Sequence, residues 1–266
     1  MKLPEVLGEW SEWRPWLAER GRELAAAIAF STRLPLPFPR AAPLGGIAIG
    51  QAAWALPLAG VLVGVIGAAV YALAHHLGVP AWPAAALTLA ATLAVTGCLH
   101  EDGLADTADG FGGGATREQK LDIMREPRIG AYGVCALVLS ILIRAAALAS
   151  FASTGPVFAA LIAAHGGARA TMPLLMFFVA PARSDGLSYA AGRPPPPSAA
   201  AAAVLGLIIL IGGLGFLSAM EAVILLAILV ALIARLSTRQ IGGQTGDVLG
   251  ALEQTSEIVI LLVAVR

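Results

Sequence analysis

The sequence predicts an all-α, polytopic membrane protein with about seven transmembrane segments and a cytoplasmic N-terminus. Of its 266 residues, 58% are hydrophobic and only 13% are charged, whereas an ordinary soluble domain carries about 25% charged residues. Several stretches of about 20 residues carry no charge, and a helix of that length spans a hydrocarbon core of about 30 Å. Basic residues gather in alternate loops, as they do in polytopic membrane proteins.

The first element is the N-terminal segment 1–23, which mixes charged residues with Trp10, Trp13 and Trp16. Tryptophans at this helical spacing beside charges indicate a helix that lies on the membrane surface, and the alternative is a disordered extension. The segment has no apolar stretch of the kind found in a cleaved signal peptide. We therefore expect residues 1–23 to be an extension and residues 24–266 to form a single transmembrane domain.

Seven apolar segments follow the extension. In the first, Gly60, Gly64 and Gly67 favour close contact with a neighbouring helix. The last is the weakest candidate span, because Glu253 and Glu257 interrupt it. The approximate bounds of the segments are 52–74, 79–99, 131–153, 157–180, 199–217, 219–234 and 248–265.

The basic residues set the orientation. All but three of the 17 lysines and arginines lie before the first segment or in alternate loops, and the exceptions are Arg144, Arg169 and Arg266. The positive-inside rule then places the N-terminus in the cytoplasm, together with the hydrophilic loops 100–130 and 235–247.

Composition and cysteine usage also exclude several function classes. The net charge is zero, with 17 acidic and 17 basic residues, which excludes a broad basic surface for nucleic acid. Cys98 and Cys135 fit no zinc or disulfide framework and are interpreted as small apolar side chains. No internal repeat is evident, so an inverted-repeat transporter has little support.

A carboxylate motif follows the second apolar segment. Asp102, Asp106 and Asp109 stand at i, i+4 and i+7, and at about 100° per residue they share one helical face. Carboxylates that crowd near a membrane repel one another, and a cation relieves that repulsion. Magnesium prefers oxygen ligands and is commonly held by a few carboxylates together with substrate phosphates. We therefore predict that these three residues bind Mg²⁺, the alternative being a solvated acidic loop.

His100, beside the motif, titrates near neutral pH and is a candidate general base. On an unbroken helix, however, it would face away from the aspartates, at about 160° from Asp102. An aspartate of the cluster or Asp247 is the alternative base.

Two arginines, Arg125 and Arg128, follow the acidic motif. Beside a metal site they are natural phosphate clamps, whereas alone they would only anchor the loop on the cytoplasmic side. Thr116 with Gln119 resembles a capping box, which predicts a short helix from Thr116 to about Arg125. We expect the two arginines to contact substrate phosphates.

Arg144 and Arg169 lie near the middle of apolar segments, where a charge is costly and usually faces the bundle interior. They contact an anionic substrate or pair structurally with Glu253 and Glu257. Both interpretations stay open, and Arg169 is retained as a candidate substrate-binding residue.

The segment Gly242–Asp247 combines glycines with polar side chains on the same side as the carboxylate motif. Gly243, Gln244 and Thr245 are candidates to close over a nucleotide, and Asp247 is a candidate to complete the metal site. The alternative is a simple turn in which Asp247 caps the last helix.

Together these motifs resemble the cobalamin synthase family. The resemblance rests on His-x-Asp-Gly-Leu-Ala-Asp-Thr-x-Asp-Gly at residues 100–110, on Ile-Met-Arg-x-Pro-Arg-Ile-Gly at 123–130, on Thr32–Pro35 and on Gly242–Asp247. It runs from about residue 24 to the C-terminus. Arg144 stands where Lys is usual in the family, which keeps the charge.

The resemblance implies a magnesium-dependent transferase in a bacterial inner membrane, with its active site on the cytoplasmic side. Its expected partners are the lipid bilayer, adenosylcobinamide-GDP, and α-ribazole or α-ribazole 5′-phosphate. The reaction gives adenosylcobalamin or its 5′-phosphate and releases GMP. The acidic motif also resembles that of CDP-alcohol phosphotransferases, but the Ala-Arg pair of their pattern is absent here. A transporter is a weaker alternative, because the acidic residues gather at one membrane boundary. The sequence predicts no oligomeric state.

Overall fold

The structure is a computed structural model, which describes residues 10–35 and 49–266 and leaves residues 1–9 of the expected extension outside the described part. The described residues form helices without a strand, which confirms the all-α class; one isolated bridge joins Pro181 to Gln244. The elements are α1 (Trp10–Ser31), α2 (Ile49–Ala52), the 3₁₀ turn η2 (Ala53–Ala55), α3 (Leu56–His76), α4 (Ala81–Thr96), α5 (Leu99–Gly113), α6 (Arg117–Ile123), α7 (Ala131–Ala149), α8 (Thr154–Phe178), α9 (Gly186–Ala191), α10 (Pro196–Leu214), α11 (Phe216–Ile241) and α12 (Gly246–Ala264).

All seven apolar segments form helices, but they are not equally suited to crossing a membrane. Among the described residues five helical stretches are long and apolar enough, and the α4–α5 pair makes a sixth if it is counted as one broken span. Helix α12 is not one of them; it carries Asp247, Glu253 and Glu257 and packs inside the bundle against α5 and α8. The count of seven spans therefore stays a prediction. The five stretches are Ile49–His76, Ala131–Ala149, Thr154–Phe178, Pro196–Leu214 and Phe216–Ile241.

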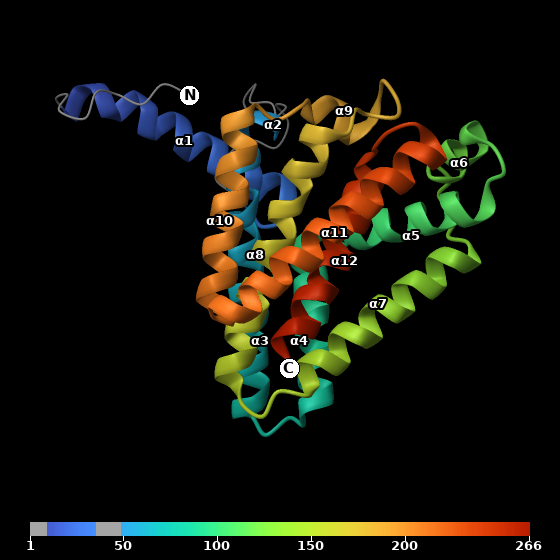
Figure 1. Ribbon diagram of the computed structural model, residues 1–266. Helices are drawn as coiled ribbons and strands as arrows, with labels where there is room; N and C mark the ends of the chain where they lie inside the picture. Colours follow the sequence, from blue (N-terminus) through green and yellow to red (C-terminus); the bar gives the residue numbers. More distant parts are fainter. Residues whose placement is uncertain (1–9, 36–48) are drawn as a thin grey trace.

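A sharp bend separates α4 from α5, which meet at 91°. Gly97 and Cys98 between them both have positive φ, at 65° and 57°. This left-handed backbone ends α4 and redirects the chain. Because of the bend, α5 turns sideways from α4 and runs towards α6 instead of continuing along α4 (Figure 1). The predicted loop 100–130 is therefore largely helical, containing α5 and the capped helix α6.

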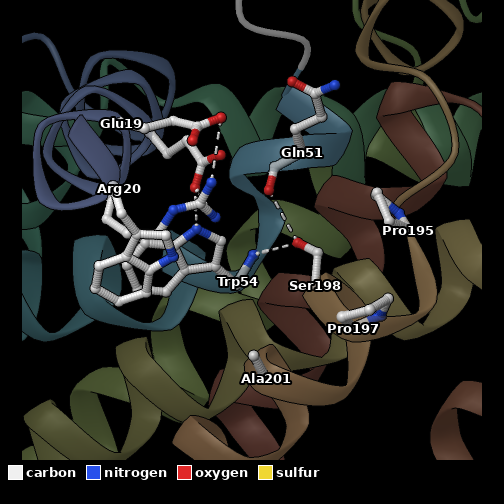
Figure 2. Close-up of a pocket in the computed structure, with 10 residues that line it drawn as sticks. Glu19, Arg20, Gln51, Trp54, Pro195, Pro197, Ser198 and Ala201 are labelled. Carbon is white, nitrogen blue, oxygen red and sulfur yellow. Dashed lines mark hydrogen bonds and ion pairs between the residues drawn. The ribbon is translucent and has the colours of Figure 1, made fainter. Parts of the chain in front are cut away.

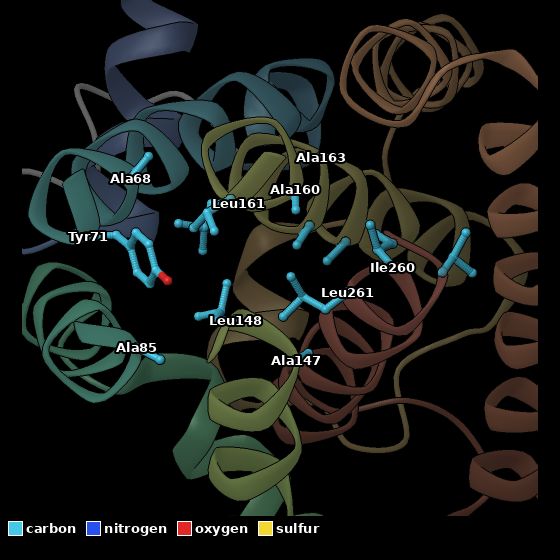
Figure 3. Close-up of a cluster of buried hydrophobic side chains, with 14 of the residues drawn as sticks. Ala68, Tyr71, Ala85, Ala147, Leu148, Ala160, Leu161, Ala163, Ile260 and Leu261 are labelled. Carbon is cyan, nitrogen blue, oxygen red and sulfur yellow. The ribbon is translucent and has the colours of Figure 1, made fainter. Parts of the chain in front are cut away.

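Helix α8 forms the centre of the bundle, with α3, α10 and α12 packed around it. Gly60 and Gly64 of α3 lie against the α8 backbone; a Cβ built on Gly64 would be 2.6 Å from the carbonyl oxygen of Leu161. The close contact predicted for these glycines is thus confirmed. Further along, α7, α8 and α12 share an apolar core that includes Leu148, Leu161 and Leu261 (Figure 3).

Helix α1 runs past residue 23 without a break, and its second half packs on α3. The buried Glu23 carboxylate accepts a hydrogen bond from the indole of Trp54 (2.5 Å) and pairs with Arg20 (2.7 Å). Beside them, the Ser198 hydroxyl accepts a hydrogen bond from Trp54 N–H and donates one to the Gln51 carbonyl, both at 3.0 Å (Figure 2). These contacts attach α1 and α10 to α2 and η2, immediately before α3.

Figure 1 shows α6 and α9 at one end of the bundle, and the α3–α4 and α7–α8 connections at the opposite end. This arrangement agrees with the loop alternation expected from the basic residues. The acidic motif lies on α5, which leads from the bend towards α6 (Figure 1).

Candidate active site

The acidic motif forms one cluster with a fourth carboxylate from the C-terminal helix. Helices α5 and α12 approach closely at Gly103 and Gly250; a Cβ on Gly103 would lie 2.8 Å from the carbonyl oxygen of Asp247. This packing places Asp247, in the first turn of α12, beside Asp102 and Asp106 of α5. The predicted association of Asp247 with the motif thus results from two small residues at a helix crossing.

The four carboxylates influence one another electrostatically. The pKa of Asp106 is raised to about 7, firstly by burial and then by the negative charges of Asp102, Asp247 and Asp109. Burial also raises the pKa of Asp247, while the nearby Arg183 guanidinium opposes that effect. The cluster therefore gathers negative charge at a partly buried position, where a cation would relieve the repulsion.

The cluster is looser than a closed metal cage. In the described part of the chain, one set of at least three potential metal ligands has all its ligand atoms within 4.8 Å of one another. That set is His165, Glu253 and Glu257, which lies elsewhere in the bundle and does not include the aspartates of the motif. Asp109 is buried, and its two oxygens accept hydrogen bonds from the backbone N–H groups of Gly130 (2.7 Å) and Gly133 (2.9 Å). It thereby caps the start of α7, a structural role that its place in the motif did not indicate.

Two cavities flank the cluster, and Asp102 lines both. The first, here called the α7 cavity, has a volume of about 470 Å³, and its walls include Asp106, Arg125, Arg128 and the α7 residue Ile141. The second, the α9 cavity, has a volume of about 240 Å³. Its polar lining residues include His100, Arg183, Ser188 and Asp247, and its apolar ones include Phe30, Met172, Met176 and Leu187.

The predicted phosphate clamps lie at the α7 cavity. Arg125 donates to both carboxylate oxygens of Asp185 at 2.7 Å and is about half exposed. Arg128 is 84% exposed and pairs with Glu126 at 3.2 Å. Both guanidinium groups are therefore accessible beside the carboxylates, as a phosphate contact requires. That contact stays a prediction.

Arg183 and Asp185 are site residues that could not be predicted from the sequence, where Arg183 is only one of the basic residues that set the orientation. Its guanidinium lies 3.4 Å from Asp185 and 3.5 Å from Asp247. Its Nη1 atom is buried and has no hydrogen-bond partner. The pairing of Ala182 with Gln244, through N–H to carbonyl at 2.8 Å, brings this segment to the start of α12. Such a contact between distant segments leaves no local sequence signal.

The segment Gly242–Asp247 forms a packed turn. Gln244 is buried and accepts a hydrogen bond from the Ser188 hydroxyl at 2.5 Å, and Gly243 leaves no room for a Cβ beside Ala182. The alternative interpretation of this segment is a turn in which Asp247 caps the last helix. The helix is capped, but by Thr245 instead of Asp247. The Thr245 hydroxyl accepts the N–H of Val248 at 3.3 Å. Asp247 is in the first turn of α12, and its Oδ2 atom accepts a hydrogen bond from the Thr245 hydroxyl at 3.1 Å.

Arg144 and Arg169 belong to a buried ionic network that lies next to the cluster. Arg144 pairs with Glu257 at 2.9 Å and with Glu101 at 3.3 Å, and Arg169 pairs with Glu253 at 2.6 Å. Of the two interpretations left open, structural pairing is the one that the geometry shows. Arg169 is 1% exposed and lines neither cavity, so its predicted substrate contact has no support here.

Both histidines of this region also belong to the network. His165 contacts Glu257, and His100 Nδ1 lies 3.4 Å from a Glu253 oxygen and 3.3 Å from an Arg169 nitrogen. His100 is 3% exposed, and its Nε2 is buried without a partner. It lines the α9 cavity, yet its ring is directed mainly into the network. Its role as a base stays a prediction that this geometry does not favour.

The comparison with known families decides the assignment. Residues 23–265 match the family of cobalamin-5-phosphate synthase. The chain belongs to this family. A relative from Bradyrhizobium diazoefficiens is 55% identical over 91% of this chain and 92% of its own length, and one from Mesorhizobium japonicum is 52% identical over the same shares. A relative from Ralstonia nicotianae is 39% identical over 93% of this chain and 96% of its own length. All three are named adenosylcobinamide-GDP ribazoletransferase. No solved structure matches the chain.

The family-like motifs of the sequence converge in space. Segments 100–110, 123–130 and 242–247 surround Asp102 and the two cavities. The Thr32–Pro35 motif packs at the bend between α4 and α5, where Arg33 N–H donates to the Val95 carbonyl and its side chain lies against Gly97. The segments on which the resemblance rests thus form the acidic site or pack at the helix bend beside it.

Proposed function

We propose that this chain is a membrane-embedded adenosylcobinamide-GDP ribazoletransferase, which joins its corrinoid substrate to α-ribazole or α-ribazole 5′-phosphate and releases GMP. The observation that carries the proposal is a carboxylate cluster between two cavities, one of them lined by arginines, in a chain 55% identical to a relative of that name. A site of this kind suits two ligands that meet at a metal-assisted phosphoryl centre.

The reaction is a displacement at phosphorus. A ribose hydroxyl oxygen of the acceptor forms a bond to the phosphorus attached to cobinamide, the anhydride bond to the GMP phosphate breaks, and GMP leaves with the electron pair of that bond. The hydroxyl proton passes to a carboxylate at the α9 cavity. Asp102 and Asp247 line that cavity and are better placed to accept the proton than His100, whose ring is engaged in the network.

The donor set of the cluster fits magnesium. Mg²⁺ usually binds through one or two carboxylates, retained waters and substrate phosphates, so a loose cluster beside a phosphate site suits it better than a closed cage would. Asp102 and Asp106 are its proposed ligands, with Asp247 as the third; Asp109 is the least available because its oxygens hold α7. When bound, the ion stabilises negative charge on the phosphate oxygens and on the departing GMP. Arg125 and Arg128 orient the same phosphates from the α7 cavity.

The proposed location is the bacterial inner membrane, with the acidic site on the cytoplasmic side. It rests on the basic residues of the loops that share one end of the bundle with the site. A cysteine at Thr116, in a variant that lacks Cys98 and Cys135, should be shielded from an impermeant thiol reagent added to intact cells and should be labelled after the cells are opened. Ready labelling in intact cells would place the site on the opposite side.

The reaction itself is tested with purified protein, adenosylcobinamide-GDP, α-ribazole 5′-phosphate and Mg²⁺. We expect GMP and a new corrinoid product in equal amounts, and neither product when the metal is chelated. If the protein instead releases CMP from a CDP-alcohol and no GMP from the corrinoid, the CDP-alcohol phosphotransferase alternative is correct. Transport of a corrinoid across vesicles without GMP release would favour the transporter alternative.

A further inference from the structure

The two cavities beside Asp102 differ in size and lining. The α9 cavity is about half as large as the α7 cavity, at 240 Å³ against 470 Å³. Its walls combine an aromatic ring, two thioethers and several aliphatic side chains, from Phe30, Met172, Met176, Leu187 and other residues. Its charged groups gather at the carboxylate cluster. The volume is slightly below the range of about 300–1,000 Å³ typical of sites for drug-sized ligands, so the cavity suits a small ligand with one apolar part.

The size and lining of the α9 cavity select between the two substrates of the proposed reaction. A corrin macrocycle is far too large for it. A guanine base would bury several N–H and C=O groups against methionine and phenylalanine side chains, which is unfavourable without hydrogen bonds. The benzimidazole base of α-ribazole is a flat, largely apolar bicycle and makes favourable contacts with methionine sulfur. The acceptor nucleoside is therefore the substrate that this cavity fits.

An unused donor lies beside the apolar part. Arg183 lines the cavity, and its side chain is 16% exposed. Two of its nitrogens face Asp185 and Asp247, whereas Nη1 is buried and has no partner. A guanidinium N–H without a partner gains most from an anionic oxygen. A phosphate at the 5′ end of the acceptor ribose would supply that oxygen.

We propose that the α9 cavity binds the acceptor nucleoside, with Met172 and Met176 against its base and Arg183 on its 5′-phosphate. This assignment rests on the proposed function and goes beyond it by separating the two substrate sites. The diphosphate of the donor then lies in the α7 cavity with Arg125 and Arg128, and its corrin ring lies outside. Asp102, which lines both cavities, stands where the acceptor hydroxyl meets the donor phosphorus.

The test is equilibrium dialysis of α-ribazole and α-ribazole 5′-phosphate, each without the donor, so that no turnover occurs. We expect Arg183→Gln to weaken binding of the 5′-phosphate about 10-fold, as loss of one charge-assisted hydrogen bond does, and to leave α-ribazole within about twofold of the original protein. The matched control, Arg128→Gln at the α7 cavity, removes an arginine that pairs with Glu126 and not with Asp185. It should leave the binding of both acceptors unchanged and raise the KM for adenosylcobinamide-GDP. The assignment is wrong if Arg128→Gln weakens acceptor binding and Arg183→Gln does not.

A second pair of variants tests the proposed contact between Met172 and the benzimidazole base of the acceptor. Met172→Trp fills the cavity and should weaken both acceptors at least about 10-fold, whereas Met172→Leu keeps the volume and should bind them within about threefold. A Met172→Trp protein that elutes as the original protein does but binds both acceptors normally would overturn the assignment. The failure of the proposed function can be distinguished from the failure of this inference. The proposed function fails if the original protein releases no GMP. The inference fails if GMP is released but acceptor binding depends on the arginine of the α7 cavity and not on Arg183.

Discussion

Two charged regions lie side by side in this apolar chain, and they differ in how their charges are balanced. The carboxylate cluster at the end of the bundle holds four aspartates, and the pKa of Asp106 is raised to about 7 by burial and by its acidic neighbours. The buried ionic network contains three glutamates, two arginines and two histidines, and its carboxylates pair with arginines or histidines. Excess charge at an accessible cavity is suited to binding a cation and phosphates. Paired charge in the interior is suited to holding helices together.

Helix α5 connects the two regions through consecutive residues. His100 and Glu101 are buried and face the network, whereas Asp102 faces the cavities. The network thus fixes α5 against α7, α8 and α12 immediately before the first aspartate of the motif. If this comparison is correct, substitutions in the network lower stability, and substitutions in the cluster lower activity at nearly constant stability.

The largest expected effect is at the centre of the network. Arg144→Met removes the arginine that pairs with Glu101 and Glu257; Glu101 then loses its cationic partner, whereas Glu257 keeps His165 and Arg169. Breaking a buried ion pair by removing one partner typically costs about 3–5 kcal/mol. We expect a loss of this size in the free energy of unfolding, measured by titration with SDS in mixed micelles. Arg144→Lys keeps the charge and should lose clearly less. Equal, small losses in both variants would show that the network does not stabilise the fold.

The next effect concerns the cluster. Asp106→Asn keeps the shape of the side chain and removes one negative charge from the proposed metal site. We expect turnover to fall at least about 100-fold, because metal charge stabilisation contributes several kcal/mol to such reactions. The SDS unfolding midpoint should remain unchanged, or rise slightly as repulsion decreases. Asp122→Asn, which removes an exposed carboxylate from the neighbouring helix α6, is the control and should keep normal turnover. Near-normal turnover in Asp106→Asn would exclude this residue as a metal ligand.

The features that depend on local spacing could be predicted from the sequence. The seven helices follow from apolar runs, and the shared face of Asp102 and Asp106 follows from the i, i+4 spacing. The bend at Gly97–Cys98 was not predicted, because nothing in the local pattern indicates a left-handed backbone at a cysteine. As a result, the first part of the predicted loop 100–130 is the helix α5, which runs at a steep angle to α4.

The remaining features depend on contacts between distant segments. Arg183 and Asp247 are 64 positions apart in the sequence. The sequence therefore could not show whether Arg183 is a site residue or only one of the basic residues of the loops. Likewise, whether Arg169 contacts substrate or Glu253 was left open, since only the packing of α8 on α12 decides it. A charge inside an apolar segment predicts a buried partner, but it does not identify that partner.

The smallest expected effect is at Asp109, which belongs to the motif by spacing but caps the start of α7 by geometry. Its carboxylate accepts two backbone N–H groups, and an asparagine oxygen could replace the carboxylate for only one of them without placing its NH₂ group against the other. We expect Asp109→Asn to lower the unfolding free energy by about 0.5–2 kcal/mol, the range of a lost helix cap. Turnover should fall less than in Asp106→Asn.

The same variant separates the two roles of Asp109, because a metal ligand and a cap respond differently to magnesium. If Asp109 acts mainly as a cap, raising the Mg²⁺ concentration will leave the turnover of Asp109→Asn unchanged relative to the original protein, and its unfolding midpoint will stay low. If the residue is a direct ligand, the variant will need a higher Mg²⁺ concentration for half-maximal turnover and will unfold as the original protein does. That second outcome would return Asp109 to the metal site predicted from spacing alone, and would mean that α7 shifts away from its carboxylate when the ion binds.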